Sequence, residues 1–438
     1  MNFIKIFSAV SVTVALLTGC VFSSGIDSLM TPPKLSLEQQ QIYTALTDAT
    51  GTSISLKYPK SGKYLSAFII EDIDGDGGNE AVVFYEKTSI AVEENTLRIN
   101  ILDSTDGKWR SVCDTPAKGA EIEKVMISKL GSNNRINLII GSSLINRSEK
   151  NVSIYTYTDG IIEETFSEAY SFIDVKDLDG NGENEFLLLS GSASGITASA
   201  DAYLLNEEGI YYQYNCKLSG NFTEFDSVNY SRIDNSRTGL YIDAVLGNGL
   251  IQTDIIYMDG SGLKKVFQTP EESAFTARPS GCTSFDIDGD GILEIPVQEI
   301  ASGYEETSES EQLKITNWYF INENDMTEKK YTSYYSINDS YIFVFPDRWA
   351  NHVTVKSDYI NDEIVFCSYD GEKAGRELLR ICCADDTPSV EDRISNGYMI
   401  MRTKGDSTCL AYIPVQEASD DGLSVSQAEV AVGFRFRE

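Results

Sequence analysis

The chain has 438 residues, with 67 acidic and 35 basic side chains, and its formal net charge is −32. Such a charge repels phosphate backbones, whose binding relies on Lys and Arg, so we expect no nucleic-acid partner. The hydrophobic fraction of 42% is large enough to build a buried core. The length predicts about two or three domains, or one large repeat array.

The first twenty residues, MNFIKIFSAVSVTVALLTGC, have the pattern of a bacterial export signal. Lys5 is followed by an apolar stretch over 6–17, shorter than the about 20 residues that a membrane-spanning helix needs. The ending LTGC resembles a lipobox, in which cleavage after Gly19 leaves Cys20 acylated, for example with palmitate. The alternative is an ordinary secretory signal with a chance cysteine. Cleavage would remove Lys5 and no acidic residue, so the net charge would move from −32 to −33.

We therefore expect a lipoprotein signal peptide over 1–19 and a lipid-anchored tether over 20–35. No later segment is long and apolar enough to span a membrane, so the lipid is the expected membrane contact. The expected location is the outer face of the cytoplasmic membrane, exposed to the cell wall or the exterior. The stretch from Ser36 to Gln39 resembles a capping box and predicts an amphipathic helix over 36–50. Its apolar face is expected to carry Leu37, Ile42, Tyr43 and Leu46.

With Cys20 lipidated, the remaining seven of the eight cysteines are an odd number at wide spacings, which does not predict a disulfide framework. Cys382 and Cys383, in the apolar run LLRICCA, are expected to be small buried strand residues. We predict no zinc site.

A nine-residue acidic motif, D-x-D-G-D/N-G-x-x-E, occurs at 72–80, 177–185 and 286–294, each time before an apolar run. Eroded copies at 129–137 and 232–240 lie between the complete ones, so the five starts are separated by 57, 48, 55 and 54 residues. About thirty residues into each unit, pairs such as Asp106-Gly107 and Asp159-Gly160, or the stretch NEND at 322–325, predict tight hairpin turns. Units of four short strands at this period predict the blades of a β-propeller.

The motif also predicts a metal site. Positions 1, 3, 5 and 9 offer side-chain oxygens, position 7 offers a carbonyl, and glycines at 4 and 6 let the chain curl so that these oxygens converge. Such a set of hard oxygen ligands suits Ca²⁺ better than transition metals. The twelfth positions, Val83, Leu188 and Val297, lie in predicted strands, which excludes an EF-hand.

The motif resembles the calcium loops of integrin-α-type FG-GAP repeats and bacterial VCBS repeats, which form β-propellers. The resemblance covers roughly residues 55–335 and implies Ca²⁺ as the cofactor, with an affinity on the order of 10⁻⁴–10⁻³ M. The implied ligands are Asp72, Asp74, Asp76, the Gly78 carbonyl and Glu80; Asp177, Asp179, Asn181, the Glu183 carbonyl and Glu185; and Asp286, Asp288, Asp290, the Ile292 carbonyl and Glu294. Asn181 replaces a carboxylate, which predicts weaker binding in the second copy. Lys129 and Arg232 begin the eroded copies and are expected to exclude a cation.

The expected fold is therefore mainly β. A propeller of roughly 54-residue, four-stranded blades is predicted over 51–335. The acidic motif is missing from 336–438, which predicts a small α+β domain of about 100 residues with a final helix around 424–434. The alternative is a seven-bladed propeller over the whole mature chain. Across most of its length the chain resembles VCBS-repeat lipoproteins of Gram-positive gut bacteria.

No catalytic residue is predicted. His352, the single histidine, lies in the apolar-flanked stretch WANHVTV, where a structural role is expected. No G-x-S-x-G is present, and the S-x-x-K match at Ser261 falls in a predicted turn. The first functional hypothesis is a surface-anchored, calcium-binding module that recognises a protein or a glycan. Tyr211, Tyr212 and Tyr214 could stack on sugars, although strand propensity also explains them. The alternatives are a hydrolase or lyase acting on an extracellular polymer, and an envelope-assembly or sensor-accessory protein.

Overall fold

The computed structural model describes residues 35–437 except 89–96, 145–148, 194 and 416–420. The predicted signal peptide, the lipidation at Cys20 and nearly all of the tether therefore lie outside the described residues. The described chain is mainly β and is built from antiparallel sheets, as the sequence predicts. Within these ranges, no helix reaches the length and hydropathy needed to cross a membrane.

The described strands form six sheets that follow one another in chain order, and we number them 1 to 6. Sheet 1 contains β1 (Ile54–Leu56), β2 (Phe68–Glu71), β3 (Glu80–Lys87), β4 (Leu97–Thr105) and β5 (Lys108–Pro116). Sheet 2 contains β6 (Glu121–Ser128), β7 (Asn137–Ser143), β8 (Lys150–Thr158) and β9 (Ile161–Tyr170). Sheet 3 contains β10 (Phe172–Lys176), β11 (Glu185–Ser190), β12 (Ser199–Leu205) and β13 (Tyr211–Lys217).

The later sheets have the same antiparallel order, with additions. Sheet 4 contains β14 (Phe222–Arg232), β15 (Thr238–Leu246), β16 (Leu250–Asp259), β17 (Gly262–Lys265) and β18 (Arg278–Pro279). Sheet 5 contains β19 (Ile295–Ile300), β20 (Lys314–Ile321), β21 (Thr327–Ser336), β22 (Tyr341–Val344) and the C-terminal β28 (Phe434–Phe436). Sheet 6 contains β23 (Val353–Asp358), β24 (Glu363–Tyr369), β25 (Ala374–Ala384), β26 (Met399–Lys404) and β27 (Ser407–Tyr412). The helical elements are α3 (Leu37–Thr50), α4 (Pro270–Ala274), the short η1 (Asp347–Trp349), α5 (Thr387–Ser395) and α6 (Gln427–Gly433).

The predicted N-terminal helix is confirmed as α3. Ser36 is its N-cap, and the reciprocal bonds between Ser36 and Gln39 form the predicted capping box. Ile42 and Leu46 are fully buried against sheet 1. Leu37 was expected on the same face, but its side chain is 74% exposed because it lies in the first turn, beyond the edge of the contact.

Burial within each sheet explains the strand sequences. The strands β3, β7 and β11 are apolar runs that are buried along most of their length. The outermost strand alternates between exposed and half-buried residues, as in β5. A strand that is covered on both faces needs no polar alternation, whereas an outer strand meets water on one face. The apolar runs after the acidic motifs are thus the inner strands.

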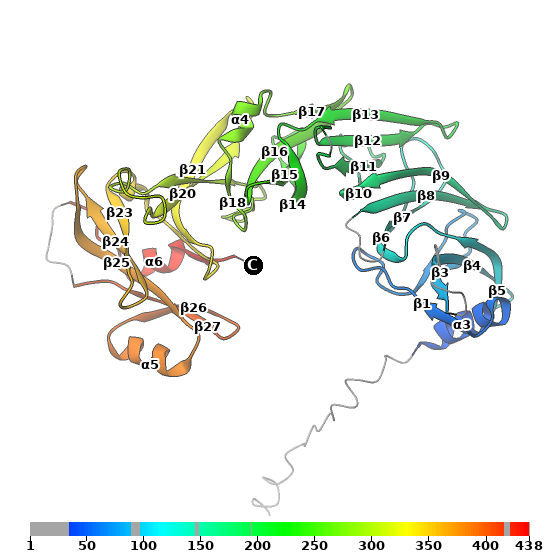
Figure 1. The fold of residues 1–438 in the computed structure, drawn as a ribbon, viewed down its shortest axis with the longest axis horizontal. Helices are drawn as coiled ribbons and strands as arrows, with labels where there is room; N and C mark the ends of the chain where they lie inside the picture. The colour runs from blue at the N-terminus through cyan, green and yellow to red at the C-terminus, as the bar shows by residue number, and fades with distance from the viewer. Residues whose placement is uncertain (1–34, 89–96, 145–148, 194, 416–420, 438) are drawn as a thin grey trace, which may run out of the picture.

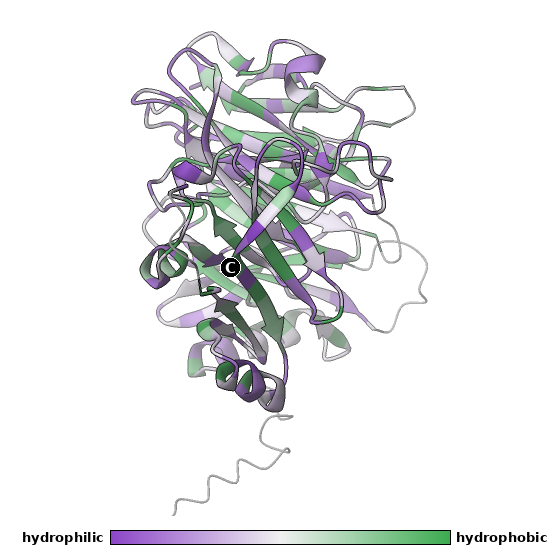
Figure 2. Cartoon of the chain, turned by 90° about the vertical axis from the view of Figure 1, so that its left-hand side faces the viewer, coloured by the Kyte–Doolittle hydropathy of each residue, from purple (hydrophilic) through white to green (hydrophobic). Residues whose placement is uncertain are grey.

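The core is a series of apolar layers between successive sheets. Side chains from sheets 1 and 2 form one layer, those from sheets 2 and 3 the next, and the series continues to sheets 5 and 6. Figure 2 shows apolar residues concentrated in the strands, while many of the connecting loops are polar. A sheet that buries its face only against its neighbours is the arrangement expected of a repeat protein.

The predicted hairpin turns are found between strands. Asp106 and Gly107 join β4 to β5, and Asp159 and Gly160 join β8 to β9, all with positive φ angles. This is the backbone that two-residue turns between antiparallel strands require, and it explains why the pairs are Asp-Gly. Asp325, in the NEND stretch, also has a positive φ angle and lies between β20 and β21.

Figure 1 shows the six sheets along an arch, with sheet 1 at one end and sheet 6 at the other. Closure into a propeller ring and the number of blades therefore stay predictions. Sheet 5 spans residue 336, where the sequence analysis placed a domain boundary, because β21 pairs with β22 and β22 pairs with β28. The predicted final helix is α6, and it leads directly into β28. The division into a propeller and a C-terminal domain stays a prediction.

One disulfide is present in the described chain. Cys383 and Cys409 face each other across β25 and β27 and are bonded. The cysteine spacing does not predict this pair, because residues 26 apart come to lie opposite each other only through strand pairing. Cys382 is a buried free thiol, as expected.

A buried ion pair in sheet 4 fixes the segment that leads to the third acidic motif. The Arg278 guanidinium lies 2.7 Å from a carboxylate oxygen of Asp243, and both side chains are almost completely buried. Asp243 also accepts hydrogen bonds from the backbone and hydroxyl of Ser284, two residues before the motif begins. Removing one partner of such a pair leaves an uncompensated buried charge.

We predict that Arg278→Met lowers the free energy of unfolding by about 3–5 kcal/mol, because Asp243 loses its counter-charge. Chemical denaturation measures the change, and Arg110→Met, at an exposed arginine of β5, is the matched control with an effect of about 0.5 kcal/mol or less. The double variant Asp243→Leu/Arg278→Met should recover part of the loss. Equal effects of Arg278→Met and Arg110→Met would contradict the assignment.

Candidate metal centres

The three complete motifs occupy equivalent places in alternate sheets. We call them loop 1 (72–80), which joins β2 to β3, loop 2 (177–185), which joins β10 to β11, and loop 3 (286–294), which leads into β19. Phe285 and Glu294 form a β-bridge that closes loop 3 at its base. The eroded copies at 129–137 and 232–240 lie between the first two strands of sheets 2 and 4. The repeat seen in the sequence therefore corresponds to the repeat of sheets.

A common set of backbone hydrogen bonds shapes each loop. In loop 1 the carboxylate of Asp72 accepts the N–H groups of Gly75 at 2.6 Å and Gly77 at 3.1 Å. Both glycines have positive φ angles, which L-residues with a side chain rarely adopt. Asp177 and Asp286 accept the corresponding bonds in loops 2 and 3. The motif's glycines are thus needed to wrap the chain around its first carboxylate.

The last residue of each loop is a buried glutamate at the start of the inner strand. Glu80, Glu185 and Glu294 are 3%, 0% and 0% exposed. Each accepts the N–H of position 2, from Ile73, Leu178 or Ile287, at 2.8–2.9 Å through one oxygen. The position-2 side chains are themselves buried and hold the loop against the sheet.

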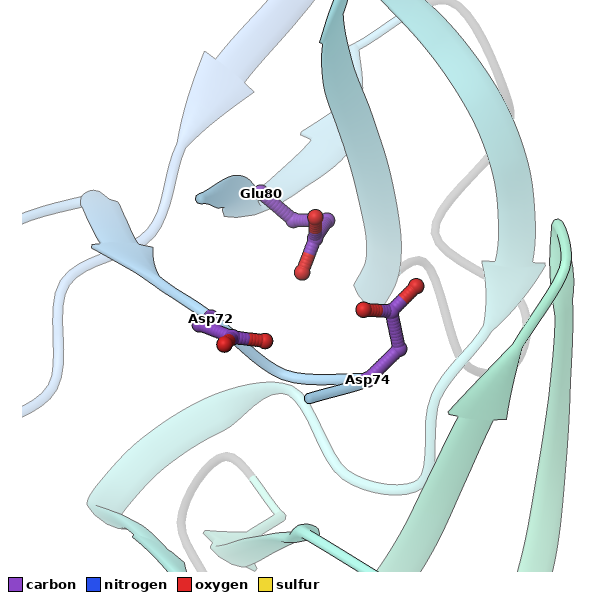
Figure 3. Close-up of side chains that lie close together, drawn as sticks. All are labelled: Asp72, Asp74 and Glu80. Carbon is purple, nitrogen blue, oxygen red and sulfur yellow. The ribbon is translucent and has the colours of Figure 1, made fainter. Parts of the chain in front are cut away.

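The side-chain oxygens converge in all three loops. Ligand atoms of Asp72, Asp74 and Glu80 lie within 4.8 Å of one another, and Figure 3 shows the three carboxylates pointing toward a common space. The same holds for Asp177, Asp179 and Glu185, and for Asp286, Asp288 and Asp290. The structure therefore brings together three of the predicted side-chain ligands in each loop, and these clusters could hold a metal ion. Asp76, Asn181 and Glu294 are not members of the clusters, and their role as ligands stays a prediction. The contribution of the Gly78, Glu183 and Ile292 carbonyls stays a prediction.

Within the described part of the chain, no ion pair reaches the acidic side chains of loops 1 and 2. In loop 2, Oε1 of Glu185 is buried and has no hydrogen-bond partner among the residues that the structure describes. Burial, together with the charges of Asp179 and Asp177, raises the pKa of Glu185 to about 7. Burial and the neighbouring aspartates raise the pKa of Glu80 to about 7 as well. Ionising these carboxyls is costly until a positive charge arrives, and an oxygen-only ligand set fits a hard divalent cation.

Loop 3 differs because a protein cation reaches it. Nζ of Lys330, on β21, lies 2.7 Å from Asp288, 2.6 Å from Asp290 and 2.7 Å from Glu294. These three hydrogen bonds raise the pKa of Lys330 above its ordinary value although burial acts in the opposite direction. Tyr331 donates a further bond to Asp288 at 2.8 Å. Sequence reasoning missed Lys330, because it lies far along the chain from the motif and reaches it only through strand pairing.

The eroded copy at 232–240 contains its own cation. Arg237 bonds to Asp234 at 2.6 Å and to Asp325 at 2.8 Å. The side chain of Arg232, which the motif predicts to exclude a cation, is exposed, and Arg237 is the group that pairs with the loop carboxylate. In the other eroded copy Lys129 is exposed, and the amides of Asn133 and Asn137 bond to nearby backbone carbonyls.

Sheet 6 contains a related arrangement that the sequence analysis did not predict. Glu363 is buried at the start of β24, the second strand of the sheet, where its carboxylate bonds to Arg380 at 2.8 Å and also to Arg393. Arg380, on β25, also forms an ion pair with Asp358 at 3.0 Å. Asp358 and Glu363 lie at the two ends of the turn between β23 and β24. This turn lacks the glycines of the motif, which is why the pattern was not visible in the sequence.

A polar hollow of about 920 Å³ adjoins this cluster. It lies between sheet 6 and α5 and includes Cys382 and the disulfide residue Cys383 in its wall. Its lining is rich in hydrogen-bonding side chains, among them Asn361, Asp362, Asp385, Asp386, Asp392, Arg393, Asn396 and Tyr398. The Tyr398 ring stacks on Tyr412 at 5.1 Å, which supports it from behind.

The other candidate residues are less well placed. Tyr211 packs against Phe166 and Tyr203, and Tyr214 lies against the core, whereas Tyr212 is 55% exposed. His352 is exposed in the turn before β23. Ser261 lies in the turn between β16 and β17, where its hydroxyl bonds to Asp259, so the S-x-x-K match does not begin a helix.

No protein-family model matches the sequence, and no curated protein matches it. Among solved structures, the chain is similar to the rhamnogalacturonan lyase YesX, with TM-score 0.27 and 10% identity over 70% of this chain and 61% of that chain. A functionally unknown protein from Desulfotomaculum acetoxidans aligns with TM-score 0.30 and 10% identity over 71% and 84% of the two chains. The periplasmic gluconolactonase PpgL of Pseudomonas aeruginosa aligns with TM-score 0.25 and 10% identity over 74% and 88%. The chain spans about three fifths of the length of the YesX lyase. These TM-scores are too low to carry an argument about fold or function.

We predict that Glu185→Gln removes the stabilisation that loop 2 gains from added Ca²⁺, because it removes the buried charge while keeping a bond to Leu178. At about a hundred times the dissociation constant, each occupied site should add about 2.7 kcal/mol to the free energy of unfolding. Denaturant melts in calcium and in EGTA measure this difference. Glu183→Gln is the matched control, since it removes the same charge from the same loop at a position where the backbone is the expected ligand. Equal behaviour of the two variants would contradict the assignment.

Proposed function

We propose that this chain is a calcium-stabilised binding module held at the outer face of the cytoplasmic membrane by a lipid on Cys20. The observation that supports the calcium site most directly is Oε1 of Glu185, which is buried and has no hydrogen-bond partner among the described residues, in a carboxyl group that lies close to those of Asp177 and Asp179. A buried charged group without a partner is costly, so a ligand that pairs with it gains stability. The oxygen-only ligand set and the backbone cradle favour Ca²⁺ as that ligand.

In this proposal Ca²⁺ supplies the positive charge that loops 1 and 2 lack. Asp72, Asp74, Asp76 and Glu80 would hold one ion, and Asp177, Asp179, Asn181 and Glu185 would hold another. One ion would connect β2 to β3 and the other would connect β10 to β11, and β3 and β11 are buried strands that pack against the neighbouring sheets. The role of the ion is therefore to stabilise the sheet array.

The hollow beside α5 is the proposed ligand site. Its volume of about 920 Å³ and its carboxylate, amide and phenol groups suit a polar ligand that forms many hydrogen bonds. Asp385, Asp386 and Asp392 would repel an anionic polymer, as would the net charge of −32. A neutral or amino-sugar glycan is the ligand class that this lining favours.

A glycan array tests this function. The full chain, in detergent, should bind neutral or amino-sugar glycans, and the double variant Asp385→Asn/Asp392→Asn should weaken binding by about tenfold or more, because two charge-assisted hydrogen bonds are lost. Glu372→Gln, at an exposed position of the β24–β25 turn outside the hollow, should bind like the wild type. Strongest binding to anionic glycans, or binding that the double variant leaves intact, would contradict the proposal.

A further inference from the structure

Lys330 places an ammonium group among the acidic side chains of loop 3. Its Nζ contacts Asp288, Asp290 and Glu294, each at 2.6–2.7 Å. Glu294 is fully buried, and the oxygen that Lys330 contacts is the one not used by the N–H of Ile287. In loop 2 the corresponding oxygen of Glu185 has no hydrogen-bond partner in the described part of the chain. Loops 2 and 3 therefore share the same backbone hydrogen bonds, but the ammonium group of Lys330 places a positive charge in loop 3.

A β-bulge explains how Lys330 reaches the loop. Along β20 and β21, Trp318 pairs with Tyr331 and Tyr319 pairs with Lys329, so Lys330 is an extra residue without a partner in the register. An extra residue of this kind bends its strand and redirects its side chain.

The other loops lack a cation at this register position. In sheet 1, Ile101 pairs with Cys113 and Leu102 with Ser111, so the extra residue is Val112. Val112 and Lys330 occupy equivalent positions, because the residue after the loop glutamate pairs with Leu102 in sheet 1 and with Tyr319 in sheet 5. Each bulge lies opposite that partner residue and the one before it. In sheet 3, Ala202 pairs with Tyr214 and Tyr203 with Gln213, and no extra residue stands between them.

We infer that Lys330 is a built-in replacement for the cation in loop 3, so that the chain takes Ca²⁺ in loops 1 and 2 only. This inference rests on the proposed function, since it presupposes calcium in the other two loops. A Ca²⁺ ion entering loop 3 would have to break three charge-assisted hydrogen bonds and would meet a positive charge at contact distance. The sequence motif alone does not distinguish loop 3 from loop 1, because both have all four carboxylates.

Protein cations serve the same purpose elsewhere in the chain. Arg237 neutralises Asp234 in sheet 4, and Arg380 neutralises Asp358 and Glu363 in sheet 6. Sheets 4 and 6 thus carry internal counter-charges at the junction of their first two strands, and sheet 5 carries one at the loop that leads into β19. The consequence is that calcium acts on the N-terminal half of the arch, while the C-terminal half keeps its loops ordered in a chelator.

Calcium stoichiometry tests the inference. Equilibrium dialysis of the full chain in detergent should give two Ca²⁺ ions per wild-type chain, three for Lys330→Val, and one for Val112→Lys. Lys329→Val is the matched control, because it removes the neighbouring exposed lysine, and it should leave two ions bound. Lys330→Val removes a lysine from the bulge in sheet 5, and Val112→Lys introduces one at the equivalent bulge in sheet 1. The two substitutions should therefore change the number of bound ions in opposite directions.

Three ions in the wild type, or no gain on Lys330→Val, would overturn the inference and leave calcium binding at loops 1 and 2 in place. No bound calcium in the wild type or in any variant would overturn the proposed calcium site itself. Should Lys330→Val not fold, Lys330→Gln keeps hydrogen-bonding capacity without the charge and should gain a third ion. Val112→Lys changes a side chain that is 40% exposed. It tests independently whether a lysine at this bulge position takes the place of the ion.

Discussion

The structure depends on supplying positive charge to acidic side chains that the backbone forces together. In sheets 1, 3 and 5, N–H groups and glycine turns hold a first carboxylate in place, and a buried glutamate begins the inner strand beside it. The same inner strands form the apolar layers between sheets. A buried carboxylate without a counter-charge is expensive, so the packing of the sheets and the electrostatics of the loops are linked.

The six sheets meet this requirement in different ways. Loops 1 and 2 leave the charge uncompensated within the protein, and the proposed calcium ions would supply it. Lys330 supplies it in sheet 5, Arg237 in sheet 4, and Arg380 together with Arg393 in sheet 6. In sheet 2 the eroded loop has lost its carboxylates, and asparagine amides bond to the backbone instead. A module stabilised in this way would be sensitive to calcium at one end and independent of it at the other, where the proposed ligand hollow lies.

Much of this was predictable from the sequence, because the decisive signals are local. The motif fixed the course of the three loops, the Asp-Gly pairs fixed the hairpin turns, and Ser36 with Gln39 fixed the start of α3. What could not be predicted depends on pairing between distant strands: the bulge that delivers Lys330, the disulfide between Cys383 and Cys409, and the arginines around Glu363. Lys129 and Arg232 are both exposed, and their exclusion of a cation stays a prediction, since position in a motif does not determine where a long side chain lies.

The most direct measurement is an anomalous difference map from crystals grown in calcium, which locates bound ions without reference to function. We expect peaks coordinated by Asp72, Asp74 and Glu80 in loop 1 and by Asp177, Asp179 and Glu185 in loop 2. In loop 3 we expect the ammonium of Lys330 among Asp288, Asp290 and Glu294, with no peak. Loops 1 and 2 without a peak at saturating calcium, or with their carboxylates turned apart toward solvent, would contradict the account.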